Sequence, residues 1–151
     1  MRVLVADDER LSRKNLVQKL REQYPEIQVE EYDDGSTAWS AVQNDSGYDL
    51  VITDMQMITM DGPELARNIH GKYPGMQILF YTAESETNLK RQGIPTERCL
   101  YKPVGEDSLK EKIDGIRELP PFELREPCIA EPQAETAPEQ KRRGFFSRLF
   151  K

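Results

Sequence analysis

Five short apolar runs, each followed by a stretch of helical character, constrain the fold of this chain most strongly. Runs of four to six residues that are rich in branched apolar side chains and bounded by Gly, Pro or acidic residues are typical of strands. The expected strands are residues 2–6, 27–32, 50–53, 76–81 and 99–101, and the expected helices are about 10–22, 36–43, 62–71, 82–92 and 105–119. This alternation predicts an α/β fold in which five βα units form one doubly wound parallel sheet.

The third run, Val51-Ile52-Thr53, is apolar and β-branched and ends on the carboxylate of Asp54. A continuous apolar strand of this kind is typical of the buried centre of a parallel sheet. In open α/β sheets the ligand chemistry lies just outside the carboxyl ends of the strands. We therefore expect Asp54 to be presented to a ligand.

Two further carboxylates are expected beside it, because Asp7 and Asp8 follow the first strand, which neighbours the third in a doubly wound order. Like charges ~4 Å apart repel by about 1 kcal/mol even in bulk water, so a cation is needed there. Mg²⁺ suits such hard oxygen ligands. Lys102, after the fifth strand, supplies a second positive charge, and Thr82, at the end of the fourth, supplies a hydroxyl. This set fits phosphoryl transfer to a carboxylate, without a His base or an activated Ser or Cys.

Residues 1–119 resemble the CheY-like receiver domain of bacterial two-component response regulators. The resemblance covers about four-fifths of the chain and implies a flavodoxin-like fold. It rests on four segments, each at the carboxyl end of an expected strand: Val3-Leu4-Val5-Ala6-Asp7-Asp8-Glu9, Asp54-Met55-Gln56-Met57 with Met60-Asp61-Gly62, Thr82-Ala83-Glu84, and Lys102-Pro103.

The resemblance implies that Asp54 is the phosphoacceptor and receives its phosphoryl group from a histidine kinase or a phosphotransfer protein. It implies that Mg²⁺ is bound directly by Asp8, Asp54 and the backbone carbonyl of Gln56, and through water by Asp7. The domain would then be a phosphoacceptor and not an enzyme in the ordinary sense, although it would assist its own phosphoryl transfer and autodephosphorylation.

Four more positions take roles from the same resemblance. Thr82 and Lys102 would contact the phosphoryl group, while Gln56 and Glu84 would tune its lifetime. Cys99 stands three residues before Lys102, at the switch position where the family usually has Tyr or Phe. The resemblance therefore does not settle whether Thr82 is coupled to an aromatic rotamer in this chain.

Composition changes sharply after residue 119. Residues 120–140 contain five of the ten prolines and five Glu against one Arg, which predicts a disordered Pro/Glu-rich linker. Residues 141–151 carry five Lys and Arg and no acidic residue. We expect three parts: a receiver domain (1–119), this linker, and a basic amphipathic C-terminal segment (141–151).

In the C-terminal segment Phe145, Phe146, Leu149 and Phe150 fall within an arc of about 140° if it is helical. Basic residues with aromatic anchors are typical of helices that lie on an anionic membrane surface. The segment is similar to short terminal membrane-targeting sequences of some bacterial division and secretion-targeting proteins. A helix bound in the groove of a partner protein and a solvated tail without function are the alternatives.

Together these features predict a single-domain response regulator that acts by contact with a downstream protein. The N-terminus does not resemble a signal peptide and Cys99 and Cys128 form no paired framework, so we expect a cytoplasmic protein, peripheral at the inner face of the cell membrane if the tail binds lipid. Nucleic acid is not an expected partner.

The alternative function is that of a phosphorylation-independent pseudo-receiver adaptor whose C-terminal segment docks on a partner. A related magnesium-dependent phosphatase is disfavoured, because Gln56 stands where such enzymes use a second carboxylate.

Overall fold

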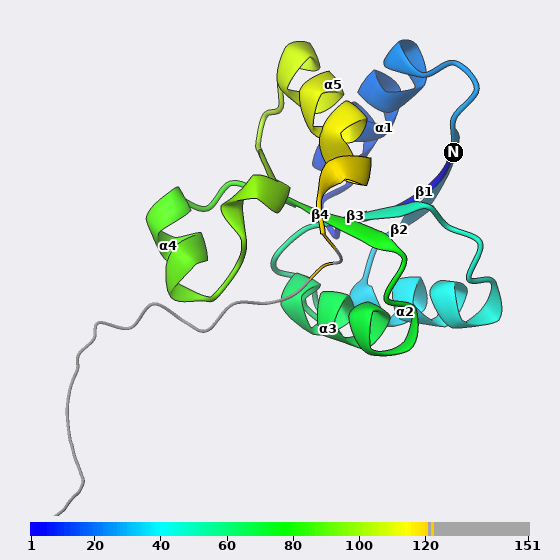
Figure 1. Cartoon of the computed structure of the whole chain (residues 1–151), viewed down its shortest axis with the longest axis vertical. Coiled ribbons are helices and arrows are strands. Elements are labelled where there is room, and N and C mark those ends of the chain that lie inside the picture. Colours follow the sequence, from blue (N-terminus) through cyan, green and yellow to red (C-terminus); the bar gives the residue numbers. More distant parts are fainter. Residues whose placement is uncertain (121, 123–151) are drawn as a thin grey trace, which may run out of the picture.

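The computed structural model describes residues 1–120 and 122. Its sheet has five parallel strands in the order β2-β1-β3-β4-β5. Helices lie on both sides of the sheet (Figure 1). The strands are β1 (Arg2–Ala6), β2 (Gln28–Tyr32), β3 (Leu50–Thr53), β4 (Gln77–Thr82) and β5 (Cys99–Tyr101). The α-helices are α1 (Arg10–Gln23), α2 (Gly35–Asn44), α3 (Gly62–Lys72), α4 (Glu86–Arg91) and α5 (Glu106–Gly115). The predicted doubly wound, flavodoxin-like fold is confirmed.

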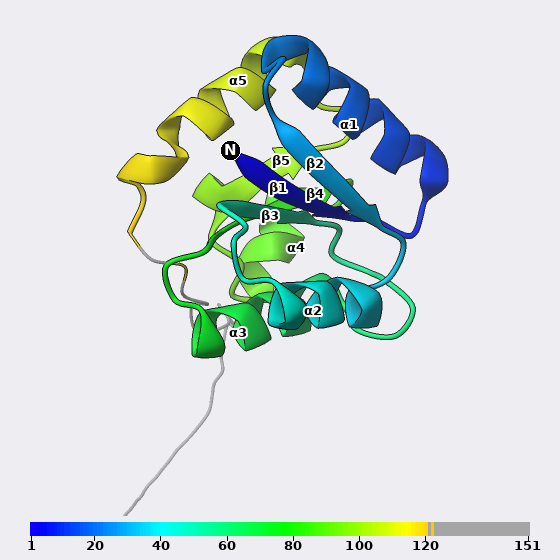
Figure 2. The same cartoon turned by 90° about the vertical axis from the view of Figure 1, so that its right-hand side faces the viewer.

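Helices cover both faces of the sheet, with α1 and α5 on one side and α2 and α3 on the other (Figure 2). Two buried apolar clusters fill the two layers, and the alternation of side chains along each strand divides the core between them. All four residues of β3 are buried, as expected for a central parallel strand. The carboxyl ends of β1 and β3 lie side by side, with Ala6 paired to Thr53.

Side-chain caps fix where three helices begin. Asp34 accepts a hydrogen bond from the backbone N–H of Thr37, Asp61 from that of Glu64, and Ser85 from that of Asn88. Each cap satisfies an N–H group that has no partner inside its helix. The Ser85 cap explains a difference from the sequence prediction: α4 begins at Glu86 and not at Thr82, which is the last residue of β4.

The end of the domain also differs from the prediction. α5 stops at Gly115 and a 3₁₀ turn (Ile116–Glu118) follows it. Phe122, three residues beyond the expected end of the domain, is 1% exposed. Its ring centroid lies 5.8 Å from that of Phe80 and 6.1 Å from that of His70. Packing therefore extends past residue 119, at least to Phe122.

A buried arginine holds this extension against the sheet. Arg98 is 2% exposed, and its guanidinium donates hydrogen bonds to the side-chain oxygen of Gln77 (2.8 Å) and to the backbone carbonyl of Pro120. Its carbon Cζ lies 5.7 Å from the ring centroid of Phe122. The chain leaving α5 is thus fixed where β4 begins.

The remaining sequence predictions for the C-terminal part lie outside the described residues. They are the linker beyond Phe122, the amphipathic segment 141–151 and its anchors Phe145, Phe146, Leu149 and Phe150. Within the described part of the chain, none of the helices has the length and apolar character that crossing a membrane requires.

Candidate functional site

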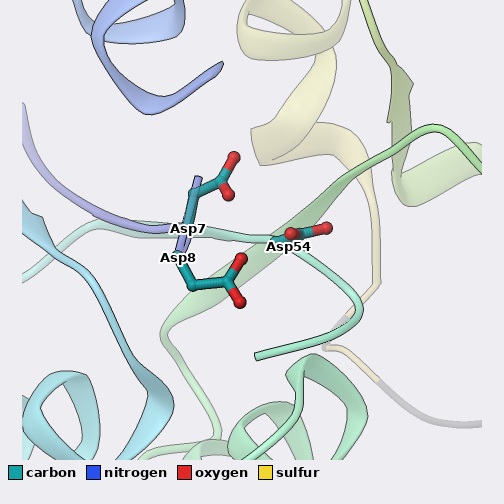
Figure 3. A group of neighbouring side chains, drawn as sticks. All are labelled: Asp7, Asp8 and Asp54. Carbon is teal, nitrogen blue, oxygen red and sulfur yellow. The ribbon is translucent and has the colours of Figure 1, made fainter. Parts of the chain in front are cut away.

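Three carboxylates gather at the carboxyl ends of β1 and β3. One oxygen from each of Asp7, Asp8 and Asp54 lies within 4.8 Å of the others. In Figure 3 the Asp7 side chain points upward and the Asp8 side chain downward, and the Asp54 carboxylate lies between their levels. The backbone N–H of Asp54 donates to the carbonyl of Ala6 (2.8 Å), which fixes the two strand ends together. Asp7 is fully buried, the Asp54 side chain is 15% exposed, and Asp8 is exposed.

Local hydrogen bonds orient two of the three carboxylates. Asp7 Oδ1 accepts from the backbone N–H of Glu9 (2.9 Å), and Asp54 Oδ1 accepts from that of Met55 (2.7 Å). Their other oxygens face Lys102, whose Nζ lies 3.0 Å from Asp7 Oδ2 and 3.5 Å from Asp54 Oδ2. One ammonium therefore faces two carboxylates, while Asp8 adds a third negative charge nearby.

This arrangement changes the acidity of the groups. Burial and the charge of Asp7 together raise the pKa of Asp54 to about 6, although Lys102 and the Met55 N–H oppose the rise. Burial by itself lowers the pKa of Lys102, but hydrogen bonds and charges from Asp7 and Asp54 outweigh it, so the pKa is raised. Lys102 thus stays a cation, and its single charge leaves the carboxylates incompletely neutralised.

Carboxylate oxygens in excess over the available cations are the ligands that Mg²⁺ prefers. The donor set of Asp7, Asp8 and Asp54 therefore fits a hard divalent ion. The sequence analysis named these three residues, and the fold brings them together from two strands separated by more than forty residues.

Beside the carboxylates lies a cavity of about 440 Å³. Its walls include Asp8, Asp54, Gln56, Thr82, Glu84 and Lys102, all of them named from the sequence. Thr82, 1% exposed at the end of β4, has a hydroxyl oxygen that accepts from the backbone N–H of Glu84 (3.0 Å). The backbone N–H of Lys102 donates to the Thr82 carbonyl (2.8 Å), so the ends of β4 and β5 meet at the cavity.

The two expected tuning residues occupy different environments. Gln56 is exposed at the edge of the cavity. Glu84 Oε1 accepts from the side chain of Gln92 (2.9 Å), whereas its Oε2 is buried without a hydrogen bond among the described residues. Glu84 therefore lines the cavity with only one of its two carboxylate oxygens hydrogen-bonded among the described residues.

Cys99 lies away from this cavity, at the start of β5 and fully buried. Its thiol donates to the backbone carbonyl of Pro95 (Sγ–O 3.6 Å), and burial raises its pKa to about 12. The aromatic residue of the same strand, Tyr101, is 40% exposed. No ring occupies the buried position at residue 99.

Two side chains near the carboxylates were not singled out from the sequence. Glu9 forms part of the cavity wall. The sequence feature that could have identified it is its position in the acidic run Asp7-Asp8-Glu9. Tyr81 lies beneath Lys102, with 5.1 Å between Nζ and its ring centroid. The available signal was its position directly before Thr82, which by strand alternation places it on the opposite face of the sheet.

Comparison with known proteins gives one consistent family. The family model described as response regulator receiver domain matches residues 3–114. The sensor protein EvgS of Escherichia coli K12 is 32% identical over 119 residues, which are 78% of this chain and 10% of that protein. Chemotaxis protein CheY-3 of Vibrio cholerae is 30% identical over 122 residues, 78% of this chain and 92% of that protein. The chain thus spans about a tenth of the sensor protein and nearly all of CheY-3.

Solved structures agree with this assignment. The chemotaxis response regulator CheY4 of Vibrio cholerae superposes with a TM-score of 0.66 at 25% identity, over 76% of this chain and 97% of that one. The receiver domain of the response regulator NarL from Mycobacterium tuberculosis gives 0.65 at 26% identity, over 78% and 97%. The chain belongs to the family of response regulator receiver domains, the CheY-like phosphoacceptor domains of two-component phosphorelay signalling.

Proposed function

We propose that this chain is a response regulator switched by magnesium-dependent phosphorylation of Asp54. The observation that carries the proposal is the position of Asp54, whose carboxylate borders the cavity between Asp8 and Lys102. In the reaction an Asp54 oxygen attacks the phosphorus of the donor. The bond from phosphorus to the leaving group breaks, and that group departs with its electron pair.

The residues around Asp54 have separate tasks. Lys102 neutralises charge on the phosphoryl oxygens. Thr82 Oγ1 already accepts from an N–H, which leaves the hydroxyl proton for a phosphoryl oxygen. Asp8, Asp54 and the Gln56 carbonyl would hold Mg²⁺, with Asp7 reaching it through water. The ion supplies positive charge that stabilises the transferred group.

Gln56 and Glu84 are proposed to set the lifetime of the phosphoryl group, since both line the same cavity as Asp54. The donor is a histidine kinase or a phosphotransfer protein, the partners of receiver domains. Output passes through contact with a downstream protein. Cys99 occupies the switch position without a ring, so the transmission of the signal does not depend on an aromatic rotamer there.

The test is labelling by a small-molecule phosphodonor. Wild type is expected to be labelled with magnesium and not with EDTA, and Asp54→Asn is expected to remain unlabelled. Asp114→Asn is the matched control, because Asp114 is an exposed carboxylate on α5 that pairs with Lys110. Labelling of Asp54→Asn at the wild-type rate would remove Asp54 from its role.

For the C-terminal segment 141–151 we propose an anchor on anionic membranes, which would make the protein peripheral at the inner face of the cytoplasmic membrane. The support is the charge and spacing of its residues alone. Full-length protein is compared in liposome co-sedimentation with a chain ending at Gln140, with and without beryllofluoride and magnesium. Sedimentation of only the full chain, and only with anionic lipid, is expected. Equal behaviour of the two chains would reject the anchor.

A phosphorylation-independent adaptor is the second candidate. The observation that favours it is Cys99, which leaves the buried switch position without an aromatic ring. The labelling experiment separates the two functions, since an adaptor remains unlabelled with magnesium present, and its partner binding does not change with beryllofluoride.

A further inference from the structure

Tyr81 is buried next to the candidate site but on the other side of the sheet from Thr82. It is 4% exposed and belongs to the apolar cluster beneath α1 and α5, whereas its neighbour Phe80 belongs to the opposite cluster. The phosphoacceptor chemistry proposed above assigns it no task. Its surroundings nevertheless include the one lysine that the chemistry requires.

The ring of Tyr81 and two carboxylates surround the Lys102 ammonium. Nζ lies 5.1 Å from the ring centroid, 3.0 Å from Asp7 Oδ2 and 3.5 Å from Asp54 Oδ2. The lysine side chain is only 15% exposed. A cation within about 6 Å of an aromatic ring is attracted to its face, and the attraction is larger where water is excluded.

The environment of the Tyr81 phenol keeps its ring neutral. Burial raises the pKa of the Tyr81 phenol, although the Ser12 hydroxyl, the charge of Lys102 and the N–H of Val104 oppose the rise. The phenol is therefore neutral at neutral pH and turns the electron-rich face of a neutral ring to the ammonium. Ser12 belongs to α1 and Val104 follows β5, so the phenol end of Tyr81 lies near both of these segments.

We propose that Tyr81 is a positioning residue that holds the Lys102 ammonium between its ring and the carboxylates of Asp7 and Asp54. Lysine has four rotatable side-chain bonds, and confining it costs entropy unless the contacts are built in advance. An ammonium that is already in position can bind the phosphoryl group without a further loss of side-chain entropy. The inference deepens the proposed function and rests on it.

The alternative is that Tyr81 only fills the core beneath α1 and α5. The two hypotheses predict different effects of removing the ring on the affinity for magnesium and on the affinity for a phosphoryl analogue. A core defect would disturb the whole site and weaken both magnesium and phosphoryl-analogue binding. Loss of a lysine support would weaken only the ligand that Lys102 contacts, because the ammonium and Mg²⁺ are drawn to the same carboxylates.

The experiment uses the full chain with Tyr81→Leu, Tyr81→Phe and the control Tyr101→Leu. Tyr101 is a neighbouring aromatic residue on β5 that is 40% exposed. Magnesium affinity is measured alone by NMR titration, and beryllofluoride affinity is measured at saturating magnesium by ¹⁹F NMR. Tyr81→Leu is expected to bind beryllofluoride about tenfold more weakly, with magnesium affinity unchanged or higher. Tyr81→Phe and Tyr101→Leu are expected within about twofold of wild type, since both retain the ring beneath Lys102.

Two results would overturn the inference while leaving the proposed function in place. In the first, Tyr81→Leu binds beryllofluoride as tightly as wild type does. In the second, Tyr81→Leu loses affinity for magnesium and for beryllofluoride in parallel. If wild type itself fails to bind beryllofluoride with magnesium, the proposed function is wrong and the role of Tyr81 is wrong with it.

Discussion

The ammonium of Lys102 lies 3.0 Å from the carboxylate of Asp7, and the two side chains are 15% and 1% exposed. Buried ion pairs of this kind contribute little net stability, but removing one partner leaves the other charge unpaired. The pair therefore links the stability of the domain to the residues proposed for its chemistry. The pair connects residue 7 to residue 102, so it links two residues near opposite ends of the domain's sequence.

Lys102→Met is expected to lower the free energy of unfolding by about 3 kcal/mol in EDTA, because Asp7 and Asp54 lose their common cation. Added Mg²⁺ should restore part of the loss, since it supplies positive charge to the same carboxylates. Urea denaturation at pH 7.5 measures both effects. Lys110→Met, which breaks an exposed pair with Asp114, should change stability by less than about 0.5 kcal/mol. Equal costs for the two substitutions would contradict the account.

Asp54 predicts a specific dependence of stability on pH. Burial, aided by the charge of Asp7, raises its pKa from 3.8 to about 6, so the folded protein holds this proton more tightly than the unfolded chain. The stability that this group contributes is therefore complete below about pH 4 and is lost as the pH rises to about 6.

The comparison that isolates this effect is wild type against Asp54→Asn in EDTA, because the other carboxyl groups titrate in both. Wild type should lose on the order of 2 kcal/mol relative to the variant between pH 4 and pH 7. Magnesium should reduce this loss. A difference between the two proteins that stays constant with pH would show that Asp54 is not perturbed.

Gly62 is expected to be indispensable for the loop that follows Asp54. A Cβ atom there would lie 2.2 Å from the backbone oxygen of Asp54 and 3.1 Å from Cα of Met55. Gly62→Ala should cost about 2 kcal/mol and weaken beryllofluoride binding, because backbone atoms must move. Gly71, in the same helix, has open space around it, so Gly71→Ala should stabilise the protein by up to about 1 kcal/mol. Thermal unfolding measures the stability of the two variants, and ¹⁹F NMR measures their beryllofluoride binding. Similar results for Gly62→Ala and Gly71→Ala would show that Gly62 has no special role.

Phe122 should stabilise the domain although it lies beyond α5. Phe122→Ala is expected to cost about 3 kcal/mol, because a fully buried ring leaves a cavity against Phe80 and His70. Leu11→Ala, at a position 69% exposed, should cost less than about 0.5 kcal/mol. Urea denaturation gives both values. A chain ending at Leu119 with wild-type stability would show that the extension does not hold the fold.

The sequence was sufficient to predict the parallel sheet and the gathering of Asp7, Asp8 and Asp54. Each follows an apolar run, and parallel strands bring their carboxyl ends to one edge. The start of α4 was placed too early, because a helical pattern does not mark where a strand ends. The signal that corrects it is Ser85, an N-cap whose side chain accepts from Asn88.

Two contacts had no local signal. Phe122 stands among prolines and acidic residues, where a single aromatic residue does not indicate burial, and its partners Phe80 and Arg98 are more than twenty residues away. Tyr81 and Lys102 meet only because β4 pairs with β5 in a particular register. Such contacts depend on the packed fold and not on the spacing of neighbouring residues. The roles assigned to the site residues remain predictions.

The most direct test of the central claim is to locate the phosphoryl group itself. The full chain is treated with a small phosphodonor and magnesium, the acyl phosphate is reduced with borohydride, and the modified residue is identified by tandem mass spectrometry. Reduction of the side chain is predicted at Asp54 alone, and it should be absent when EDTA replaces magnesium. Modification at Asp7 or Asp8, or equal modification with EDTA, would contradict it.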